Sequence, residues 1–350
     1  MRYKLLGNSG LRVSELCLGA MTFGEAWGWG ASPAVSHAMI DRFFEAGGNF
    51  VDTANGYTGG DSETIIGDWL AAKGGRERMV LGTKFTQWLP GSDNPNIVGN
   101  SRKAMTDSVE ASLRRLRCDY IDVYWVHAWD YTTRPEELMR GLDDLVRAGK
   151  ILYPAISDAP AWVIAQCNTI ADLRGWSPFV ANQVEYSLLE RAAERDLIPM
   201  SRTLDIAVVA WSPLGRGLLT GKYLDAGQGK RGRIDTTKTP VPEGQRREIV
   251  EAVVALARDL GRSPAEVALA WVRQQGTIPI VGATSVAQLD ANIACLDLVL
   301  DADQLAGLDA LSAIEKGFPH EFHVKNRGTV FGGFFDRLDR HREHGIGTNA

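Results

Sequence analysis

The feature that most constrains the fold is a repeated alternation of short apolar runs with longer amphipathic stretches. Eight runs are rich in β-branched residues and almost continuously hydrophobic, as expected of strands buried on both faces. Strands that alternate with helices form a parallel sheet, and eight such units favour a closed (β/α)8 barrel of TIM type over an open sheet. We predict one α/β barrel domain over residues 1–350. The predicted strands are Glu15–Ala20, Asn49–Asp52, Met79–Thr83, Ile121–Val126, Ile151–Ile156, Phe179–Val184, Ala207–Ala210 and Thr277–Val281.

The stretches between these runs have the periodicity of helices. Met105, Val109, Leu113 and Leu116 recur at helical spacing before the fourth strand. Ser263-Pro264-Ala265-Glu266 forms a capping box with proline at the first helical position, so we predict a helix from there to about Gln275.

Three segments lie outside the repeat. Residues 2–13 resemble a hairpin that turns at Gly7-Asn8-Ser9-Gly10 and plugs the barrel floor. Residues 212–242, after the seventh strand, form a long loop rich in glycine and basic residues, and residues 315–350 form a tail with five phenylalanines. Long loops in a compact enzyme are usually lids or binding segments, so we expect cofactor clamping and substrate choice in these two.

Charge and cysteine content exclude several classes of partner. A net charge of -5 gives no general attraction to nucleic acid or to anionic membranes. We find neither a signal-peptide core nor an apolar run long enough to span a bilayer. The four cysteines are scattered, which argues against a zinc site and against a disulfide framework. We expect a cytoplasmic protein without a metal that acts on a small molecule, and its oligomeric state stays open.

One motif in the long loop is misleading. Gly227-Gln228-Gly229-Lys230-Arg231-Gly232 matches the GxGxxG dinucleotide fingerprint. That fingerprint binds pyrophosphate only where a strand leads into it and a helix opens from it. Neither context is present in the flanking sequence, so we interpret the segment as a flexible basic loop.

Polar residues follow the second, third and fourth predicted strands. Asp52 ends the second strand and Tyr57 lies five residues later, while Lys84 follows the third and His127 the fourth. Alone, each has an ordinary explanation, such as a helix cap, a packed tyrosine, a solvated lysine or a buried histidine. Reacting groups of a (β/α)8 barrel lie at the carboxyl ends of its strands, so these four side chains are expected on one rim.

These residue types suit the reduction of a carbonyl by hydride. Hydride addition places negative charge on the oxygen, which must receive a proton. A free tyrosine has a pKa near 10, and a lysine ammonium nearby is expected to lower that pKa, with an aspartate holding the lysine in place. An imidazole on the same rim can hydrogen-bond the carbonyl oxygen.

The chain resembles the aldo-keto reductase superfamily, and within it the branch of the potassium-channel β-subunit. The matching stretches follow the family order over residues 1 to about 312 and include Phe50-Val51-Asp52-Thr53-Ala54, Gly82-Thr83-Lys84, Tyr124-Trp125-Val126-His127, Asn182-Gln183-Val184-Glu185-Tyr186-Ser187, Trp211-Ser212-Pro213-Leu214-Gly215-Arg216-Gly217 and Pro279-Ile280-Val281-Gly282-Ala283. The resemblance implies an NAD(P)(H)-dependent interconversion of carbonyl and alcohol, with Tyr57 as proton donor, Lys84 and Asp52 supporting it, and His127 orienting the substrate.

The resemblance also implies a cofactor site. Ser157, Asp158 and Gln183 would hold the nicotinamide carboxamide, and Trp211 would stack on the ring. Residues after the seventh strand would lie along the pyrophosphate, and residues after the eighth would surround the adenosine end. The full predicted set is Gly19, Met21, Asp52, Ser157, Asp158, Gln183, Trp211, Ser212, Leu214, Gly217, Lys222, Arg233, Gly282, Thr284, Gln288 and Asn292.

The sequence departs from the family pattern at two places. Family members commonly carry asparagine where this chain has Asp158, which can accept a hydrogen bond from the carboxamide but cannot donate one. Many NADP-binding members carry a cation after the last strand, whereas this chain has Ala283, Thr284 and Ser285. The channel-subunit branch uses small hydroxyls and glutamine there and still takes NADP(H), and Lys222, Arg231 or Arg233 can supply the charge. We favour NADP(H) and keep NAD as an alternative.

Two other functions stay open at this stage. A regulatory or binding module is one, because the channel-subunit branch has the same barrel. A Schiff-base aldolase with Lys84 as nucleophile is the other, although it requires an unpaired lysine.

The substrate and the direction of reaction are not apparent from the sequence. Five tryptophans in or near the loops of the reactive face suggest an aromatic pocket, and ordinary packing explains them nearly as well. They are Trp27, Trp29, Trp88, Trp125 and Trp129, and of these we assign Trp88 to the substrate site beside Tyr57 and His127.

Overall fold

The computed structural model describes residues 1–87, 93–224, 230–231, 234–235 and 242–337. Eight parallel strands form a closed barrel in the order β12-β3-β4-β5-β6-β7-β8-β9, which confirms the predicted (β/α)8 architecture. Each predicted strand is present, with ends that differ by a few residues. The bounds are β3 Cys17–Gly19, β4 Phe50–Asp52, β5 Val80–Phe85, β6 Ile121–Val126, β7 Ile151–Ser157, β8 Ala181–Glu185, β9 Ala207–Trp211 and β12 Ile278–Gly282.

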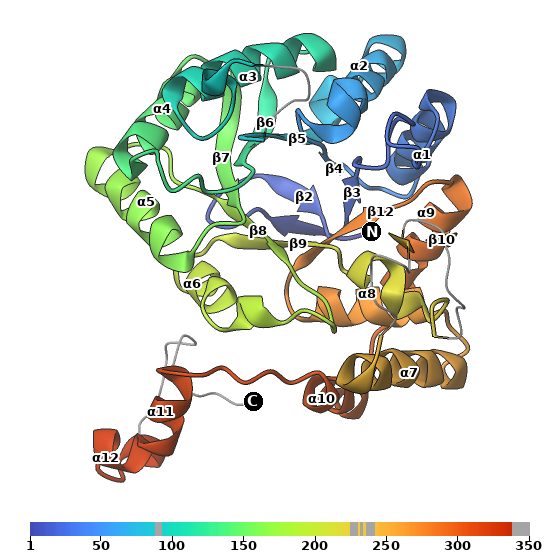
Figure 1. The fold of residues 1–350 in the computed structure, drawn as a ribbon, viewed down its shortest axis with the longest axis vertical. Helices are drawn as coiled ribbons and strands as arrows, with labels where there is room; N and C mark the ends of the chain where they lie inside the picture. Colours follow the sequence, from blue (N-terminus) through green and yellow to red (C-terminus); the bar gives the residue numbers. More distant parts are fainter. Residues whose placement is uncertain (88–92, 225–229, 232–233, 236–241, 338–350) are drawn as a thin grey trace.

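Helices surround the barrel and bury their apolar faces against it (Figure 1). The capping box at Ser263 begins a helix at Pro264, as predicted, because the Ser263 side chain and Glu266 satisfy each other's backbone amides. The helices of the ring are α1 Pro33–Glu45, α2 Asp61–Lys73, α3 Arg102–Leu116, α4 Pro135–Arg147, α5 Ala161–Arg174, α6 Leu197–Thr203, α7 Gly244–Asp259, α8 Pro264–Gln274, α9 Val286–Ile293 and α10 Ala302–Leu311. Among the described helices, none combines the length and the apolar character needed to cross a bilayer.

The tail begins after α10 and contains α11 His320–Lys325 and α12 Arg327–Phe331, which lie outside the ring of helices (Figure 1). Its contacts run to the start of α6, where Arg195 donates to the carbonyl oxygen of Glu315 at 3.0 Å and His320 lies 3.2 Å from Asp196. Phe318 and Phe322 remain exposed. The expectation that the tail governs substrate choice stays a prediction.

The amino-terminal hairpin closes one end of the barrel. Strands β1 Tyr3–Leu5 and β2 Arg12–Ser14 pair antiparallel, as predicted. Leu6 and Val13 are fully buried in a cluster with Phe50, Val123 and other residues of the barrel interior. The Lys4 ammonium donates to the carbonyl oxygen of Thr277 at 2.9 Å, just before β12. The carboxyl ends of the strands are therefore left as the open end, which we call the rim together with the loops that follow.

The turn of the hairpin fits against the barrel only with glycine at position 7. Gly7 has a φ of 59°, and a Cβ there would meet the backbone of Asp205 at 2.7 Å and Ala207 at 2.8 Å. Both contacts are to backbone atoms, which cannot move aside as a flexible side chain can.

We expect Gly7→Ala to lower the free energy of unfolding by about 2 kcal/mol or more, because it combines a left-handed backbone with a steric clash. The measurement is urea denaturation followed by circular dichroism. Gly10→Ala is the matched control, since a Cβ at Gly10 meets no atom within 4 Å. Equal stability of the two variants would contradict the proposed fit of the turn.

Candidate active site at the carboxyl ends of the strands

The four predicted catalytic residues meet at the rim. Asp52 is the last residue of β4, and Lys84 is the next-to-last residue of β5, where it pairs in register with Trp125 of β6. His127 directly follows β6. Tyr57 opens η1 Tyr57–Gly60, which follows β4. Parallel pairing of adjacent strands aligns their carboxyl ends, which is why residues 75 positions apart in the chain become neighbours.

Lys84 is the centre of this group. Its side chain is completely buried, and its ammonium forms an ion pair with Asp52 and donates to the carbonyl oxygen of Thr53 at 2.8 Å and to the Tyr57 hydroxyl at 3.3 Å. Burial opposes the charged form, but Asp52 and Tyr57 outweigh it and raise the pKa of Lys84 above its usual value. A charged, paired lysine does not suit the Schiff-base alternative, which needs a free amine.

Lys84 acts on the Tyr57 pKa in the predicted direction, but the predicted net lowering of that pKa is absent in the protein alone. Burial raises the pKa of Tyr57 above its usual value, and the ammonium of Lys84 opposes that rise without cancelling it. The sequence predicts the lysine but not the extent to which packing removes water from the phenol. Tyr57 is therefore protonated at neutral pH, which is the form a proton donor requires.

His127 faces Tyr57 with its ring at 78° to the phenol and the ring centres 5.8 Å apart. Burial, together with the charge of Lys84, holds the pKa of His127 well below its usual range, so the imidazole is neutral at neutral pH. Its Nδ1 is buried and has no hydrogen-bond partner among the described residues. A neutral imidazole beside a phenol can hydrogen-bond a ligand oxygen without adding a charge.

Two further side chains surround the Asp52 carboxylate. Gln183 Nε2 donates to Asp52 Oδ1 at 3.4 Å from across the barrel. Burial raises the pKa of Asp52, and the nearby Trp125 indole acts in the opposite direction, although Trp125 Nε1 makes no hydrogen bond to a described residue. A Cβ at Gly82 would lie 2.8 Å from the Trp125 indole nitrogen and 3.2 Å from Asp52 Oδ1, so glycine leaves the space that this approach needs.

The aromatic-pocket interpretation is wrong for two of the five tryptophans. Trp125 is fully buried in the barrel interior, and Trp129 packs in the main core at 8% exposure. Their positions on and just after β6 turn them inward, where they fill space. Trp27 lies at the rim, with its ring centre 6.5 Å from that of Tyr57 and 5.5 Å from that of Trp29. Trp88 lies outside the described residues.

The predicted nicotinamide residues lie together at the ends of β7, β8 and β9. The Ser157 hydroxyl donates to the carbonyl oxygen of Gln183 at 3.0 Å. The Trp211 indole donates to Asp158 Oδ1 at 3.2 Å. This last contact joins the ends of β7 and β9, and it could not be predicted from the sequence, because nothing in the spacing of residues 158 and 211 signals it.

A second part of the predicted cofactor set surrounds the end of β12. Gly282 pairs in register with Gly19, and Gly19 with Asp52. Asn292 donates to the carbonyl oxygen of Gly282 at 3.2 Å. The backbone amide and the hydroxyl of Thr284 lie 2.9 and 3.1 Å from Gln288 Oε1. Met21 follows β3 and is half-buried.

The remaining predicted residues lie in the loop after β9. Ser212 Oγ accepts from the backbone amide of Arg216 at 3.0 Å, Leu214 packs on the core, and Gly217 lies in η5 Gly215–Thr220. Lys222 is exposed, with its ammonium 5.0 Å above the centre of the Tyr223 ring. Within the GxGxxG match, Lys230–Arg231 pairs as a strand with Ile234–Asp235, and the rest of the match lies outside the described residues, as does Arg233.

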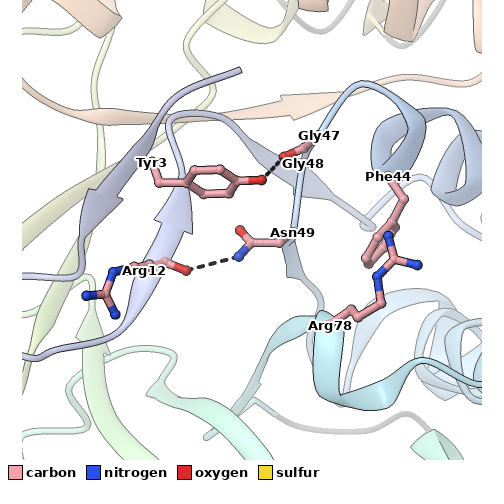
Figure 2. A pocket seen from close by; sticks show the side chains of 7 residues that line it. All are labelled: Tyr3, Arg12, Phe44, Gly47, Gly48, Asn49 and Arg78. Atoms are coloured by element: carbon pink, nitrogen blue, oxygen red, sulfur yellow. Dashed lines mark hydrogen bonds between the residues drawn. The ribbon is translucent and has the colours of Figure 1, made fainter.

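Outside the rim, the described residues offer no metal site, and one further cavity lies away from the catalytic residues. Among the described residues, no group of His, Cys, Asp and Glu has the arrangement of a metal site. Figure 2 shows a separate cavity lined by hairpin residues Tyr3 and Arg12 and by Asn49 and Arg78, which precede β4 and β5. It therefore lies at the opposite end of the barrel from Lys84.

Comparisons with known proteins agree with this geometry. Residues 15–313 match the Aldo/keto reductase family. A norsolorinic acid reductase of Aspergillus flavus is 37% identical over 327 residues, which are 91% of this chain and 82% of that protein. An NADP+ aryl-alcohol dehydrogenase of Phanerodontia chrysosporium is 38% identical over 336 residues, covering 91% of this chain and 87% of that protein. Norsolorinic acid reductase B of Dothistroma septosporum is 36% identical over 345 residues, covering 95% of this chain and 86% of that protein.

We expect Lys84→Met and Asp52→Asn each to lower the free energy of unfolding by about 3 to 5 kcal/mol, because each leaves a buried group without its partner. The double variant should lose much less than the sum. Urea denaturation of the wild type, the two single variants and the double variant gives the coupling energy between Lys84 and Asp52. The exposed pair Lys103 and Asp107, 3.2 Å apart on α3, is the control and should give a much smaller coupling. Additive losses at Lys84 and Asp52 would contradict a shared buried ion pair.

Proposed function

Because the chain belongs to the aldo/keto reductase family, a family of nicotinamide-dependent enzymes that interconvert carbonyls and alcohols, we propose that it uses NADP(H) and acts on aromatic carbonyl compounds. The observation that carries the proposal is the hydrogen bond between the buried Lys84 ammonium and the Tyr57 hydroxyl, beside the neutral His127. We further propose that residues 1–350 act as one catalytic domain. The four cysteines are free thiols, which supports a reducing compartment such as the cytoplasm.

The rim has donors and open space that suit a nicotinamide dinucleotide. Ser157 and Gln183 offer polar groups for a carboxamide, and Trp211 offers an aromatic face beside them. A Cβ at Gly282 would meet no atom within 4 Å, so the end of β12 leaves room for a ligand. The exposed Lys222 supports NADP(H) over NAD(H), since an exposed ammonium can pair with an additional phosphate. So does the relative whose name specifies NADP+.

A nicotinamide cofactor bound at the rim would supply the hydride to the carbonyl carbon, and side chains of the protein would supply the proton and the hydrogen bonds to the carbonyl oxygen. Tyr57, held protonated by burial, donates its proton to the developing alkoxide. Lys84 stabilises the phenolate that remains, since its ammonium hydrogen-bonds the same oxygen. Asp52 keeps Lys84 charged and fixed. His127, which is neutral, hydrogen-bonds the substrate oxygen and orients it toward Tyr57.

Two tryptophans of the loop after β3 support an aromatic substrate. Trp27 lies edge-on to Tyr57 at 75° and is 40% exposed, so its ring is available beside the proton donor. Trp29 packs against it, with ring centres 5.5 Å apart. An exposed aromatic ring next to a reactive group, supported from behind by a second ring, can bind planar rings by stacking. The relatives named for norsolorinic acid and aryl alcohols support the same substrate class.

We expect Tyr57→Phe to lower kcat for NADPH-dependent reduction of aromatic aldehydes by about 10²- to 10⁴-fold, because the proton donor is lost. NADPH absorbance gives the rate, and fluorescence titration should give an NADPH Kd close to that of the wild type. Tyr3→Phe, at the opposite end of the barrel, is the control, since it also removes one hydroxyl that makes a hydrogen bond. The proposed function fails if no aldehyde in the panel is reduced faster by the wild type than by Tyr57→Phe.

We expect Trp27→Ala to lower kcat/KM for benzaldehyde derivatives by about tenfold, and for linear aldehydes by less than about twofold, because only planar rings lose stacking. Trp162→Ala is the matched control, because Trp162 is an exposed tryptophan on α5. An equal loss for both substrate classes would instead indicate a general role in shaping the loop.

A further inference from the structure

Asp158 has a carboxylate where the family commonly has a neutral amide. Backbone hydrogen bonds hold both its amide and its carbonyl group. The backbone amide of Asp158 donates to the carbonyl oxygen of Gln183 at 3.4 Å, and its carbonyl oxygen accepts from the backbone amide of Trp129 at 3.3 Å. Its φ of 45° is in the left-handed region, which aspartate and asparagine tolerate better than most residues. The backbone from which this side chain extends is therefore held in place by the fold.

This carboxylate lies between the two residues that we assign to the nicotinamide. Asp158 Oδ1 accepts from the Trp211 indole at 3.2 Å, and the backbone amide of Asp158 donates to the carbonyl oxygen of Gln183. The side chain is exposed in the protein alone, so it is accessible to a ligand at the rim.

The charge of Asp158 is not neutralised by an ion pair within the part of the chain that the structure describes. Partial enclosure raises the pKa of Asp158, whereas the Trp211 indole and the charge of Lys84 favour the carboxylate. Lys84 itself is paired with Asp52. The field of Asp158 also reaches the reactive phenol, since its charge contributes to raising the pKa of Tyr57.

A nicotinamide ring carries a positive charge when oxidised and none when reduced, so a carboxylate at its edge distinguishes the two forms. We propose that Asp158 gives this protein a preference for the oxidised cofactor over the reduced one, relative to an asparagine at the same position. This inference rests on the proposed function, because it requires a nicotinamide beside Trp211. The same charge favours hydride donation, since positive charge develops on the ring as the hydride leaves.

Two consequences follow for turnover. Tighter binding of the oxidised form makes its release slower in the direction of carbonyl reduction. It also allows alcohol oxidation to begin at a lower concentration of oxidised cofactor. Asp158 would therefore influence the relative rates of carbonyl reduction and alcohol oxidation when both cofactor forms are present.

The test is the ratio of two dissociation constants, Kd for NADP+ divided by Kd for NADPH, measured without substrate by calorimetry and by quenching of tryptophan fluorescence. The carboxamide is the same in both forms, so a changed hydrogen bond to it cancels in the ratio and the charge effect remains. We expect Asp158→Asn to raise the ratio about tenfold, the size expected for one unit charge near another at a partly hydrated site.

Two controls separate charge from shape. Asp172→Asn removes an exposed carboxylate from the last turn of α5 and should leave the ratio unchanged. Asp158→Glu retains the charge and should keep the ratio nearer to the wild-type value than Asp158→Asn does. A ratio that stays within twofold in Asp158→Asn overturns the inference. If the wild type binds neither cofactor form, with NAD+ and NADH also tested, the proposed function itself fails, so the two failures are distinguishable.

Discussion

The buried ion pair of Lys84 and Asp52 is the interaction on which the rest of the site depends. Both side chains are removed from water, and such a pair is stable only where the geometry and the additional hydrogen bonds are good. The barrel supplies these conditions by placing the ends of β4 and β5 side by side, with the carbonyl oxygen of Thr53 as another acceptor. Gln183 and Trp125 approach the same carboxylate from farther round the barrel. Asp52, Lys84 and His127 of the catalytic tetrad, which Tyr57 completes, are thus held on or directly after strands of the barrel wall.

Much of the fold and the tetrad could be predicted from the sequence because each depends on a local pattern. Strands buried on both faces produce continuous apolar runs, and parallel pairing then aligns their polar carboxyl ends, so Asp52, Lys84 and His127 had to converge. Trp125 and Trp129 were misassigned because an aromatic residue near a strand end can point into the barrel, into the helix layer or into a pocket. The bond between Asp158 and Trp211 depends on a left-handed backbone and on strand order, which no short motif encodes.

The pKa of Tyr57 illustrates why residue identity alone does not determine the chemistry of a site. Lys84 favours the phenolate, as its identity suggests, yet burial has the larger effect and raises the pKa of Tyr57. A protonated phenol is suited to reduction, whereas oxidation of an alcohol requires a base. The same residue can meet both demands only if its surroundings change between the two directions.

The charge of the cofactor provides such a change under the proposed function. Tyr57 experiences one more positive charge nearby when the nicotinamide is oxidised, and this favours the phenolate in the state in which a base is needed. Asp158 acts on Tyr57 in the opposite direction, since its negative charge favours the protonated phenol. The acid–base balance of Tyr57 is then set jointly by Lys84, Asp158 and the redox state of the ligand. Because Asp158 influences both the cofactor and the phenol, a single carboxylate couples cofactor preference to proton transfer at this rim.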